Sequence, residues 1–367
     1  VINASATLTK LGGSILAPPA LAAMADAAGS YVDLYELQRV VSARIAELTH
    51  NEACYVSSGA AAGIMLSVAT CIAGTDAERM GAFPYLDGID RREVIIHRSQ
   101  RNGYDYAARQ TGARLVEIDG HADALDGVIS DHTACVLWFA GAHFADGALP
   151  VEEVIEIAHA RGVPVIVDAA AQVPPISSLW HFTRDLGADA AIFSGGKGLR
   201  GPQSSGLVLG KRDIIEGCRA DGAPNHSIGR PMKVGKEELV GLLAAVEWSL
   251  QQDESAMLAR YEEIVQGWLA GLGDIPGITV ERGYPSEAGQ PHSRAIVHIA
   301  PPCPLTRDEV IDALWDGSPR IAVAAIAVDA IALNPQTLMA GEETTVLEAV
   351  RGVVGGEECG RRNVESG

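Results

Sequence analysis

The chain has 367 residues, enough for one or two packed domains. Hydrophobic residues make up 47% of it and charged residues 20%, which excludes a disordered chain and a fibrous architecture. The 47 acidic residues outnumber the 28 basic ones and give a formal charge of -19. Because the electrostatic field of a negatively charged protein repels nucleic-acid phosphates, we expect no nucleic-acid partner.

The six cysteines are widely spaced, with no CxxC pair and no cysteine–histidine cluster at zinc-ligand spacing. We therefore expect reduced thiols and no metal site, as in a cytoplasmic protein. The longest apolar stretches are interrupted well before the roughly 20 residues that a membrane span needs, and the start does not resemble a signal peptide. The sequence predicts a cytoplasmic protein with no membrane partner.

The first predicted element is a helix in which Leu37, Val41 and Ile45 share one face, with Asp33 placed as its N-terminal cap. A second, apolar helix follows Tyr55-Val56-Ser57-Ser58-Gly59-Ala60 and runs to about Ile72. Backbone N–H groups of Ser58, Gly59 and Ala60 at its start would form an anion site suited to a phosphate. The Walker lysine is absent, which disfavours a nucleoside triphosphate. Close packing of small residues explains the same pattern.

From about residue 35 to 210 short β-rich runs alternate with helical periodicity, which is typical of a mostly parallel sheet with helices on both faces. The helix Val151–Arg161 is one of the connecting helices. The predicted strands are Val94–His97, Leu115–Ile118, Cys135–Phe139, Val165–Asp168, Ala190–Phe193 and Leu207–Leu209.

After Gly210 the pattern changes. A connector rich in Gly, Pro and Asn leads to one long helical stretch, about residues 236–272. Shorter strands are predicted at 278–281, 293–299 and 320–327, with a helix at 307–315. We therefore expect an N-terminal segment and large α/β domain at residues 1–235, followed at 236–367 by a linking helix and a smaller C-terminal α+β domain.

Lys197 follows the predicted strand Ala190–Phe193 in the segment Ser-Gly-Gly-Lys-Gly-Leu-Arg-Gly-Pro-Gln, which begins at Ser194. In a cleft, desolvation lowers the pKa of a lysine and makes its amine a nucleophile or base that can form a Schiff base. An exposed lysine in a flexible loop fits the same spacing. Ser194 is a second candidate phosphate ligand.

Asp168 ends the predicted strand Val165–Asp168, upstream of Lys197. Ligands of open α/β sheets bind outside the carboxyl ends of strands, so we expect Asp168 and Lys197 to converge on one crevice. An aspartate there can pair with the protonated pyridine nitrogen of pyridoxal phosphate, and the small Ala170 would let a flat ring lie against the strand. A helix cap and a metal ligand are alternative interpretations of Asp168.

The helix start at Ser58-Gly59-Ala60, the strand that ends at Asp168 and the Lys197 segment follow one another in an order and at separations that resemble the fold type I pyridoxal-phosphate enzymes. The resemblance is strongest to the branch of bacterial selenocysteine synthase (seryl-tRNA selenium transferase) and D-glucosaminate-6-phosphate ammonia-lyase. The likeness runs from Asn3-Ala4-Ser5-Ala6-Thr7 to the Gly229–Glu237 segment and Leu333-Asn334-Pro335. It implies a mostly parallel seven-stranded sheet, pyridoxal 5'-phosphate as cofactor, and a homodimer or higher homo-oligomer with shared active sites. It also implies Lys197 as the Schiff-base lysine and Asp168 as the pyridine partner.

The resemblance also implies substrate-binding residues. Arg230 and Lys233 stand where this family places basic residues that hold a phosphate, often across a subunit interface. Their spacing predicts two donors on one helical face, although a solvated helix start would look the same. Arg320, at the start of a late strand, is a candidate for the substrate carboxylate.

The segment after the strand Val94–His97 holds further candidates. Gln100 is expected near the cofactor ring, although its side chain offers no aromatic face to stack on it, and Arg98 and Arg101 are expected to contact substrate anions. His97 and His143 lie beside apolar strands and are predicted to be hydrogen-bonded core histidines.

The charge of -19 favours a small-molecule lyase over a tRNA-binding enzyme. The predicted reaction removes the alpha proton and a beta leaving group from an amino acid or amino-sugar acid such as D-glucosaminate 6-phosphate, giving a 2-keto acid and ammonia. An aldolase, a racemase and a β-replacement transferase use the same cofactor chemistry. A non-catalytic binding protein that kept the fold is the alternative from another class.

Overall fold

The fold is known from a computed structural model, which describes residues 1–356. The chain forms two compact units: Ser14–Gln252, and a second one that joins Val1–Gly13 to the residues from Asp253 onward. The sequence had placed the boundary at residue 235. The division comes later because helix α11 (Lys236–Ser249) packs on α1 (Pro18–Ala28) and α2 (Leu34–Leu48) of the larger unit.

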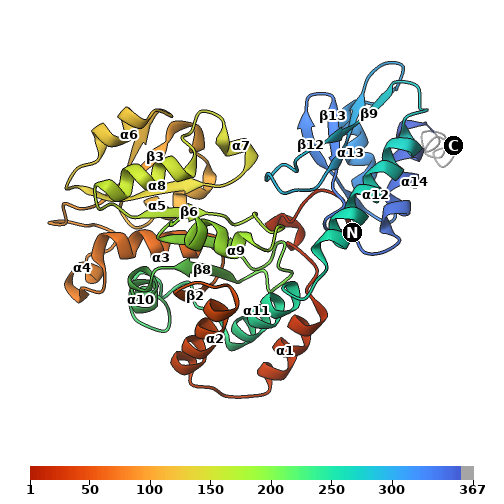
Figure 1. The fold of residues 1–367 in the computed structure, drawn as a ribbon. Coiled ribbons are helices and arrows are strands. Elements are labelled where there is room, and N and C mark those ends of the chain that lie inside the picture. Colours follow the sequence, from red (N-terminus) through yellow and green to blue (C-terminus); the bar gives the residue numbers. More distant parts are fainter. Residues whose placement is uncertain (357–367) are drawn as a thin grey trace. The chain divides into compact units, whose positions relative to one another are not determined.

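The larger unit contains a seven-stranded sheet with the order β2-β8-β7-β6-β5-β3-β4 (Figure 1). Neighbouring strands are parallel except around β8, which runs antiparallel to both β2 and β7. The mostly parallel sheet predicted from the sequence is therefore confirmed. Its strands are β2 (Ala53–Ser57), β3 (Glu93–His97), β4 (Arg114–Ile118), β5 (Thr133–Phe139), β6 (Val165–Asp168), β7 (Ala190–Ser194) and β8 (Gly206–Gly210).

Helices cover both faces of this sheet, as a buried parallel sheet requires. Alternate residues of β6 point to opposite faces, so Val165 and Val167 join one hydrophobic cluster while Ile166 joins the other. The first cluster includes α2, α11 and α8 (Val151–Ala160). The second includes α3 (Ala60–Ala73), α5 (Tyr106–Arg109) and α10 (Arg212–Asp221). Shorter helices are α4 (Ala77–Gly81), α6 (Ala122–Val128), α7 (Ala142–Ala145) and α9 (Ser178–Trp180).

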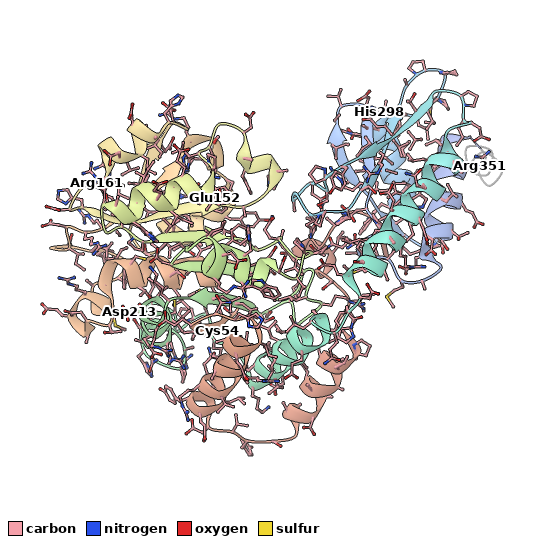
Figure 2. All side chains as sticks on the ribbon, viewed as in Figure 1. Cys54, Glu152, Arg161, Asp213, His298 and Arg351 are labelled. Atoms are coloured by element: carbon pink, nitrogen blue, oxygen red, sulfur yellow. The ribbon has the colours of Figure 1, made fainter. Side chains whose placement is uncertain are left out.

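Side-chain hydrogen bonds cap one of these helices and join two others. The predicted cap of α2 is confirmed, because the Asp33 carboxylate accepts hydrogen bonds from the backbone N–H groups of Tyr35 (2.9 Å) and Glu36 (3.1 Å). Arg161, which follows α8 and is labelled in Figure 2, donates two hydrogen bonds of 2.8 and 2.6 Å to Asp126 of α6. This bidentate pair holds the two helices together at the surface.

The smaller unit contains a four-stranded antiparallel sheet with the order β12-β13-β10-β9. The N-terminal residues belong to this unit because β1 (Ile2–Asn3) pairs in parallel with β11 (Ile321–Ala322). One hydrophobic cluster joins the sheet to its helices. The other elements are β9 (Ile278–Gly283), β10 (Arg294–Ile299), β12 (Ala324–Ala327), β13 (Ala330–Leu333), α12 (Glu254–Leu272), α13 (Arg307–Asp316) and α14 (Glu342–Val354).

Two elements predicted as continuous are interrupted. The expected helix 236–272 is two helices, because α11 ends at Ser249 and Asp253 caps a new helix by accepting a hydrogen bond from the N–H of Ala256 at 2.9 Å. The expected strand 320–327 is divided between β11 and β12, which belong to different sheets. The sequence interpretation also missed β2, β13 and α14.

Candidate active site

Three of the segments singled out in the sequence end at one edge of the large sheet. Strand β6 ends at Asp168 and its parallel neighbour β7 ends at Ser194. Strand β2, which ends at Ser57, runs in the same direction as β7 because β8 lies between them and is antiparallel to both. The fold therefore brings the start of α3, Asp168 and the Lys197 loop to the same edge.

Helix α3 begins against β8 with open backbone donors. Its N-cap, Gly59, has a φ of 129°, a value that favours glycine, and no side chain caps the helix. A Cβ atom on Gly206 of β8 would lie 2.7 Å from the carbonyl carbon of Gly59 and 2.9 Å from the nitrogen of Ala60, so the helix start rests directly on the strand. Ser58, Gly59 and Ala60 are half-buried, and the unpaired N–H groups of a first turn suit a phosphate.

Lys197 lies in a tightly packed loop between β7 and β8. A Cβ atom on Gly195 would lie 2.1 Å from the hydroxyl oxygen of Ser205, and one on Gly198 would lie 2.0 Å from the carbonyl oxygen of Val173. Only glycine fits at such contacts. Lys197 itself is half-buried. The alternative of an exposed lysine in a flexible loop is therefore wrong.

Asp168 is 7% exposed at the end of β6. Burial raises the pKa of its carboxyl group, while the N–H of Ala170, 2.9 Å from Oδ1, and the positive charge of Lys197 lower that pKa. The charge of Lys197 thus acts on the Asp168 carboxyl group across the sheet edge that both segments share. A carboxylate, an amine and a helix start at one sheet edge can hold the pyridine nitrogen, the aldehyde carbon and the phosphate of pyridoxal phosphate, so the residues present fit this cofactor.

Gln100, expected near the cofactor ring, is turned toward the backbone of β5, the strand next to β6. It is fully buried, and its Nε2 donates to the carbonyl oxygens of Phe139 (3.1 Å) and Phe144 (3.3 Å). Its Oε1 accepts a hydrogen bond from the N–H of Phe139 at 3.0 Å. The amide is therefore used by the backbone of β5 and α7, and Gln100 acts as a structural link between β3 and β5.

Arg98 and Arg101 both form ion pairs within the chain, although Arg98 remains 64% exposed. Arg98 pairs with Glu117 at 3.5 Å and with Asp119 at 3.4 Å. Arg101 pairs with Asp105 at 2.6 Å and also with Glu117. These contacts lie at the β3–β4 side of the sheet, which β5 separates from β6. Both arginines follow the carboxyl end of β3, two strands away from β6 in the sheet.

Arg230 and Lys233 are exposed in the connector between α10 and α11. The expected shared helical face is wrong, because the helix begins only at Lys236. Among residues 1–356, no carboxylate forms an ion pair with either side chain, so both charges are available to an outside anion. Arg320 belongs to the smaller unit, where its guanidinium lies 5.5 Å from the ring centroid of Trp315.

The two histidines differ. His97 is fully buried, accepts a hydrogen bond at Nε2 from the N–H of Leu149 at 3.3 Å, and has a pKa lowered to about 4 by burial. The prediction of a core histidine is confirmed for His97 and wrong for His143. His143 is exposed in α7, just after the carboxyl end of β5, with its ring 3.9 Å from that of Phe144.

Within the part of the chain that the structure describes, no group of three or more His, Cys, Asp or Glu residues is arranged to hold a metal ion. In that same part, no helix is both long enough and apolar enough to span a membrane.

A mostly parallel seven-stranded sheet, with a buried aspartate after β6 and a glycine-enclosed lysine after β7, defines a pyridoxal-phosphate enzyme of fold type I. Residues 92–299 match the family Aminotransferase class-V. The chain belongs to this family of pyridoxal-phosphate-dependent enzymes, which confirms the predicted family and cofactor.

Three relatives show where in this family the chain lies. The chain is 32% identical to 5'-C-glycyluridine monooxygenase-decarboxylase of Streptomyces sp, over 82% of this chain and 75% of the relative. It is 30% identical to D-glucosaminate-6-phosphate ammonia lyase of Salmonella typhimurium, over 96% of this chain and 94% of the relative. L-seryl-tRNA(Sec) selenium transferase of Moorella thermoacetica is 28% identical over 67% of this chain and 54% of the relative.

A solved structure of D-glucosaminate-6-phosphate ammonia-lyase is similar to the chain as a whole. It matches with a TM-score of 0.83 and 29% sequence identity, over 96% of this chain and 95% of the other. The likeness to this branch, predicted from the motifs, is therefore confirmed over nearly the full length.

Proposed function

We propose that this enzyme is a lyase that removes the alpha proton and a beta hydroxyl group from a phosphorylated amino acid or amino-sugar acid, such as D-glucosaminate 6-phosphate, and releases a 2-keto acid and ammonia. The observation that carries the proposal is the buried Asp168 at the end of β6, at the same sheet edge as the Lys197 loop that follows β7. The similarity to an ammonia lyase over 96% of this chain supports the reaction type.

The proposed cofactor contacts follow from the sheet edge. The N–H groups of Ser58, Gly59 and Ala60 bind the cofactor phosphate at the start of α3, with the Ser194 hydroxyl as a further donor. The Asp168 carboxylate keeps the pyridine nitrogen protonated. Ala170 would leave room for the ring because its side chain is a single methyl group. When bound, pyridoxal phosphate withdraws electrons from the substrate's alpha carbon and so acidifies its proton.

Lys197 is the proposed base. Its Nζ atom, freed when the substrate amine takes its place, removes the alpha proton. The electron pair left on carbon expels the beta hydroxyl group, which takes up a proton and departs as water. The released enamine then adds water and loses ammonia, which leaves the 2-keto acid. Asp168 stays ionised throughout because the positive charge that it faces is retained.

Arg230 and Lys233 are proposed to hold a distal phosphate of the substrate. They are exposed and unpaired with any described carboxylate, which suits residues that complete the site of a neighbouring subunit. We therefore also propose a homodimer or higher homo-oligomer with shared active sites, without nucleic acid or membrane as a partner. Five free cysteines among the described residues support a reducing compartment such as the cytoplasm.

The substitution Arg230→Ala tests the phosphate role. It should raise KM for a phosphorylated substrate more than it lowers kcat, because the contact is made equally in the ground and transition states. Arg79→Ala, on the exposed helix α4, is the matched control and should change neither parameter. A collapse of kcat with an unchanged KM would show that Arg230 does not hold the substrate.

A second candidate reaction rests on the 32% identity to a monooxygenase-decarboxylase. The two candidates differ in their products and in their demand for oxygen. We would incubate the holoenzyme with D-glucosaminate 6-phosphate and with β-hydroxy amino acids while measuring ammonia, 2-keto acid, dissolved oxygen and carbon dioxide. Equal yields of ammonia and keto acid without oxygen uptake are expected. Oxygen uptake with release of carbon dioxide would contradict the lyase and favour the second candidate.

A further inference from the structure

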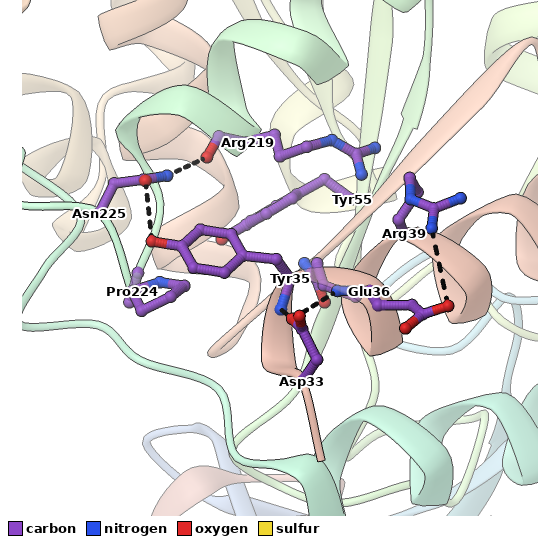
Figure 3. A pocket seen from close by; sticks show the side chains of 10 residues that line it. Asp33, Tyr35, Glu36, Arg39, Tyr55, Arg219, Pro224 and Asn225 are labelled. Carbon is purple, nitrogen blue, oxygen red and sulfur yellow. Dashed lines mark hydrogen bonds and ion pairs between the residues drawn. The ribbon is translucent and has the colours of Figure 1, made fainter.

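We propose that the larger unit has a second small-molecule site, on the outer edge of strand β2, that binds a planar nitrogen heterocycle carrying a phosphate. Figure 3 shows this pocket, a cavity of about 480 Å³ between the first turns of α2, strand β2 and the segment that follows α10. A cavity of this size holds a ligand as large as a mononucleotide. None of the residues proposed for the cofactor or the substrate lines it.

One buried polar atom in this pocket has no hydrogen-bond partner among residues 1–356. Gln38 is 8% exposed; its Nε2 donates to the carbonyl oxygen of Val56 at 2.8 Å, while its Oε1 makes no hydrogen bond. The Nε atom of Arg219 is buried and lies 3.5 Å from a carboxylate oxygen of Glu216. Tyr55 is a further buried side chain of the lining, with 2% of its surface exposed. Buried polar groups are nearly always hydrogen-bonded, so the unpaired Gln38 Oε1 at the wall of this cavity indicates a missing ligand.

The pocket is held in shape by the chain around it. A Cβ atom on Gly222 would lie 2.0 Å from the Tyr55 hydroxyl oxygen, so this position requires glycine. The hydroxyl of Tyr35 donates to Asn225 Oδ1 at 3.3 Å, and Asn225 Nδ2 donates to the carbonyl oxygen of Arg219 at 2.9 Å. Figure 3 shows these two bonds linking Tyr35 of α2 through Asn225 to Arg219 of α10 at one side of the pocket. The site is therefore preformed, which favours binding.

The lining defines the chemistry of the ligand. The rings of Tyr35 and Tyr55 and the ring of Pro224 offer flat apolar surfaces, which suit a planar ring. Gln38 Oε1 needs an N–H or O–H donor on the ligand. Burial raises the pKa of Tyr55, so its hydroxyl group stays neutral and can donate, as can Arg219.

Two guanidinium groups and two carboxylates line the pocket; Asp33 is held by the N–H groups of the first turn of α2, which leaves the guanidinium groups as the partners for an anionic group on the ligand. Arg39 lies 3.9 Å from Glu36, and both of these side chains are 66% exposed, so this ion pair holds Arg39 only weakly. Arg219 lies 3.5 Å from Glu216. Both can turn toward a phosphate. The shared chemistry of ring, N–H donor and phosphate is found in nucleoside monophosphates and in phosphorylated B6 vitamers.

Calorimetric titration of the holoenzyme tests the proposal. The probes are adenosine monophosphate, uridine monophosphate and pyridoxine 5'-phosphate, which lacks the aldehyde and cannot react with a lysine; inorganic phosphate is the ring-free control. Saturable binding of one class of heterocyclic phosphate, and much weaker binding of inorganic phosphate, is expected. The class that binds identifies the source of the ligand.

Variants then locate the binding. Tyr55→Phe removes one hydrogen bond and should weaken binding about tenfold, and Arg219→Gln should weaken it roughly 30-fold because a charged donor is lost. Tyr85→Phe, at a position that is 80% exposed and outside the pocket, should leave binding unchanged. Hydrogen exchange of the unsubstituted holoenzyme should show protection of residues 35–39 and 222–225 on binding. No saturable binding below about 1 mM, or binding that neither pocket variant weakens, would overturn the proposal.

Discussion

Gly206 offers a direct test of the phosphate cradle. A Cβ atom there would lie 2.7 Å from the Gly59 carbonyl carbon, 2.9 Å from the Ala60 nitrogen and 2.9 Å from the Phe193 carbonyl oxygen. All three are backbone atoms, so no side-chain rotation relieves the overlap, and Gly206→Ala must push the start of α3 away from β8. Overpacking of this kind costs about 1–3 kcal/mol of unfolding free energy.

Because the cofactor phosphate is proposed to bind at this helix start, Gly206→Ala should also weaken pyridoxal phosphate binding about tenfold. The assay titrates apoenzyme with cofactor, followed by visible absorbance, beside urea unfolding of the apoenzyme. Gly127→Ala is the matched control, since a Cβ atom there would meet nothing within 4 Å. If Gly206→Ala lost stability yet bound the cofactor as tightly as the unsubstituted enzyme, the phosphate would not lie at the start of α3.

Two further predictions concern buried titratable groups. The Asp168→Asn enzyme should still bind the cofactor, but its kcat should fall at least about 100-fold because a neutral amide does not hold the pyridine nitrogen protonated. An unchanged kcat would refute the role of the carboxylate. His97, with a pKa lowered to about 4 from its usual 6.5, is neutral in the folded state, so the unfolded chain takes up the proton first as the pH falls. Unfolding free energy should therefore drop by about 3 kcal/mol between pH 6.5 and pH 4 in urea titrations, and this drop should shrink in His97→Gln. An equal drop in both proteins would assign the pH dependence to other groups.

The central strands were predictable because they are continuous apolar runs buried on both faces. Strand β6 has the predicted bounds, Val165–Asp168. Strand β2 was missed because the strand is only five residues long and contains several small side chains. Its partner β8 also lies some 150 residues further along the chain, so the pairing leaves no local signal. The break between α11 and α12 carried a readable signal, since Asp253 is a typical N-cap residue within an otherwise helical pattern.

In the candidate site too, some residues could be placed from the sequence and others could not. Asp168 and Lys197 could be placed together because each follows a strand, and parallel strands end at one edge of a sheet. The side chains after β3 could not be placed, because their direction depends on partners elsewhere in the fold. Gln100 turns to the backbone of Phe139, and Arg101 turns to Asp105 and Glu117.

The pocket at the outer edge of β2, which Tyr55 and Gln38 line, was not predictable from the sequence. Its lining comes from three segments that lie far apart in the chain, and the unpaired Gln38 Oε1 becomes visible only when burial and hydrogen bonds are known. Tyr55 and Gln38 are ordinary residues of a strand and a helix when they are considered alone.

The central claim is that Lys197 holds the cofactor. The measurement that tests it most directly is borohydride reduction of the holoenzyme followed by peptide mass spectrometry, with visible spectra of Lys197→Ala and of the control Lys10→Ala, an exposed lysine of the other unit. A pyridoxyl phosphate group fixed to Lys197, and a visible absorption band that Lys197→Ala loses and Lys10→Ala keeps, is the predicted result. A group fixed to another lysine, or a visible band that survives in Lys197→Ala, would contradict the account.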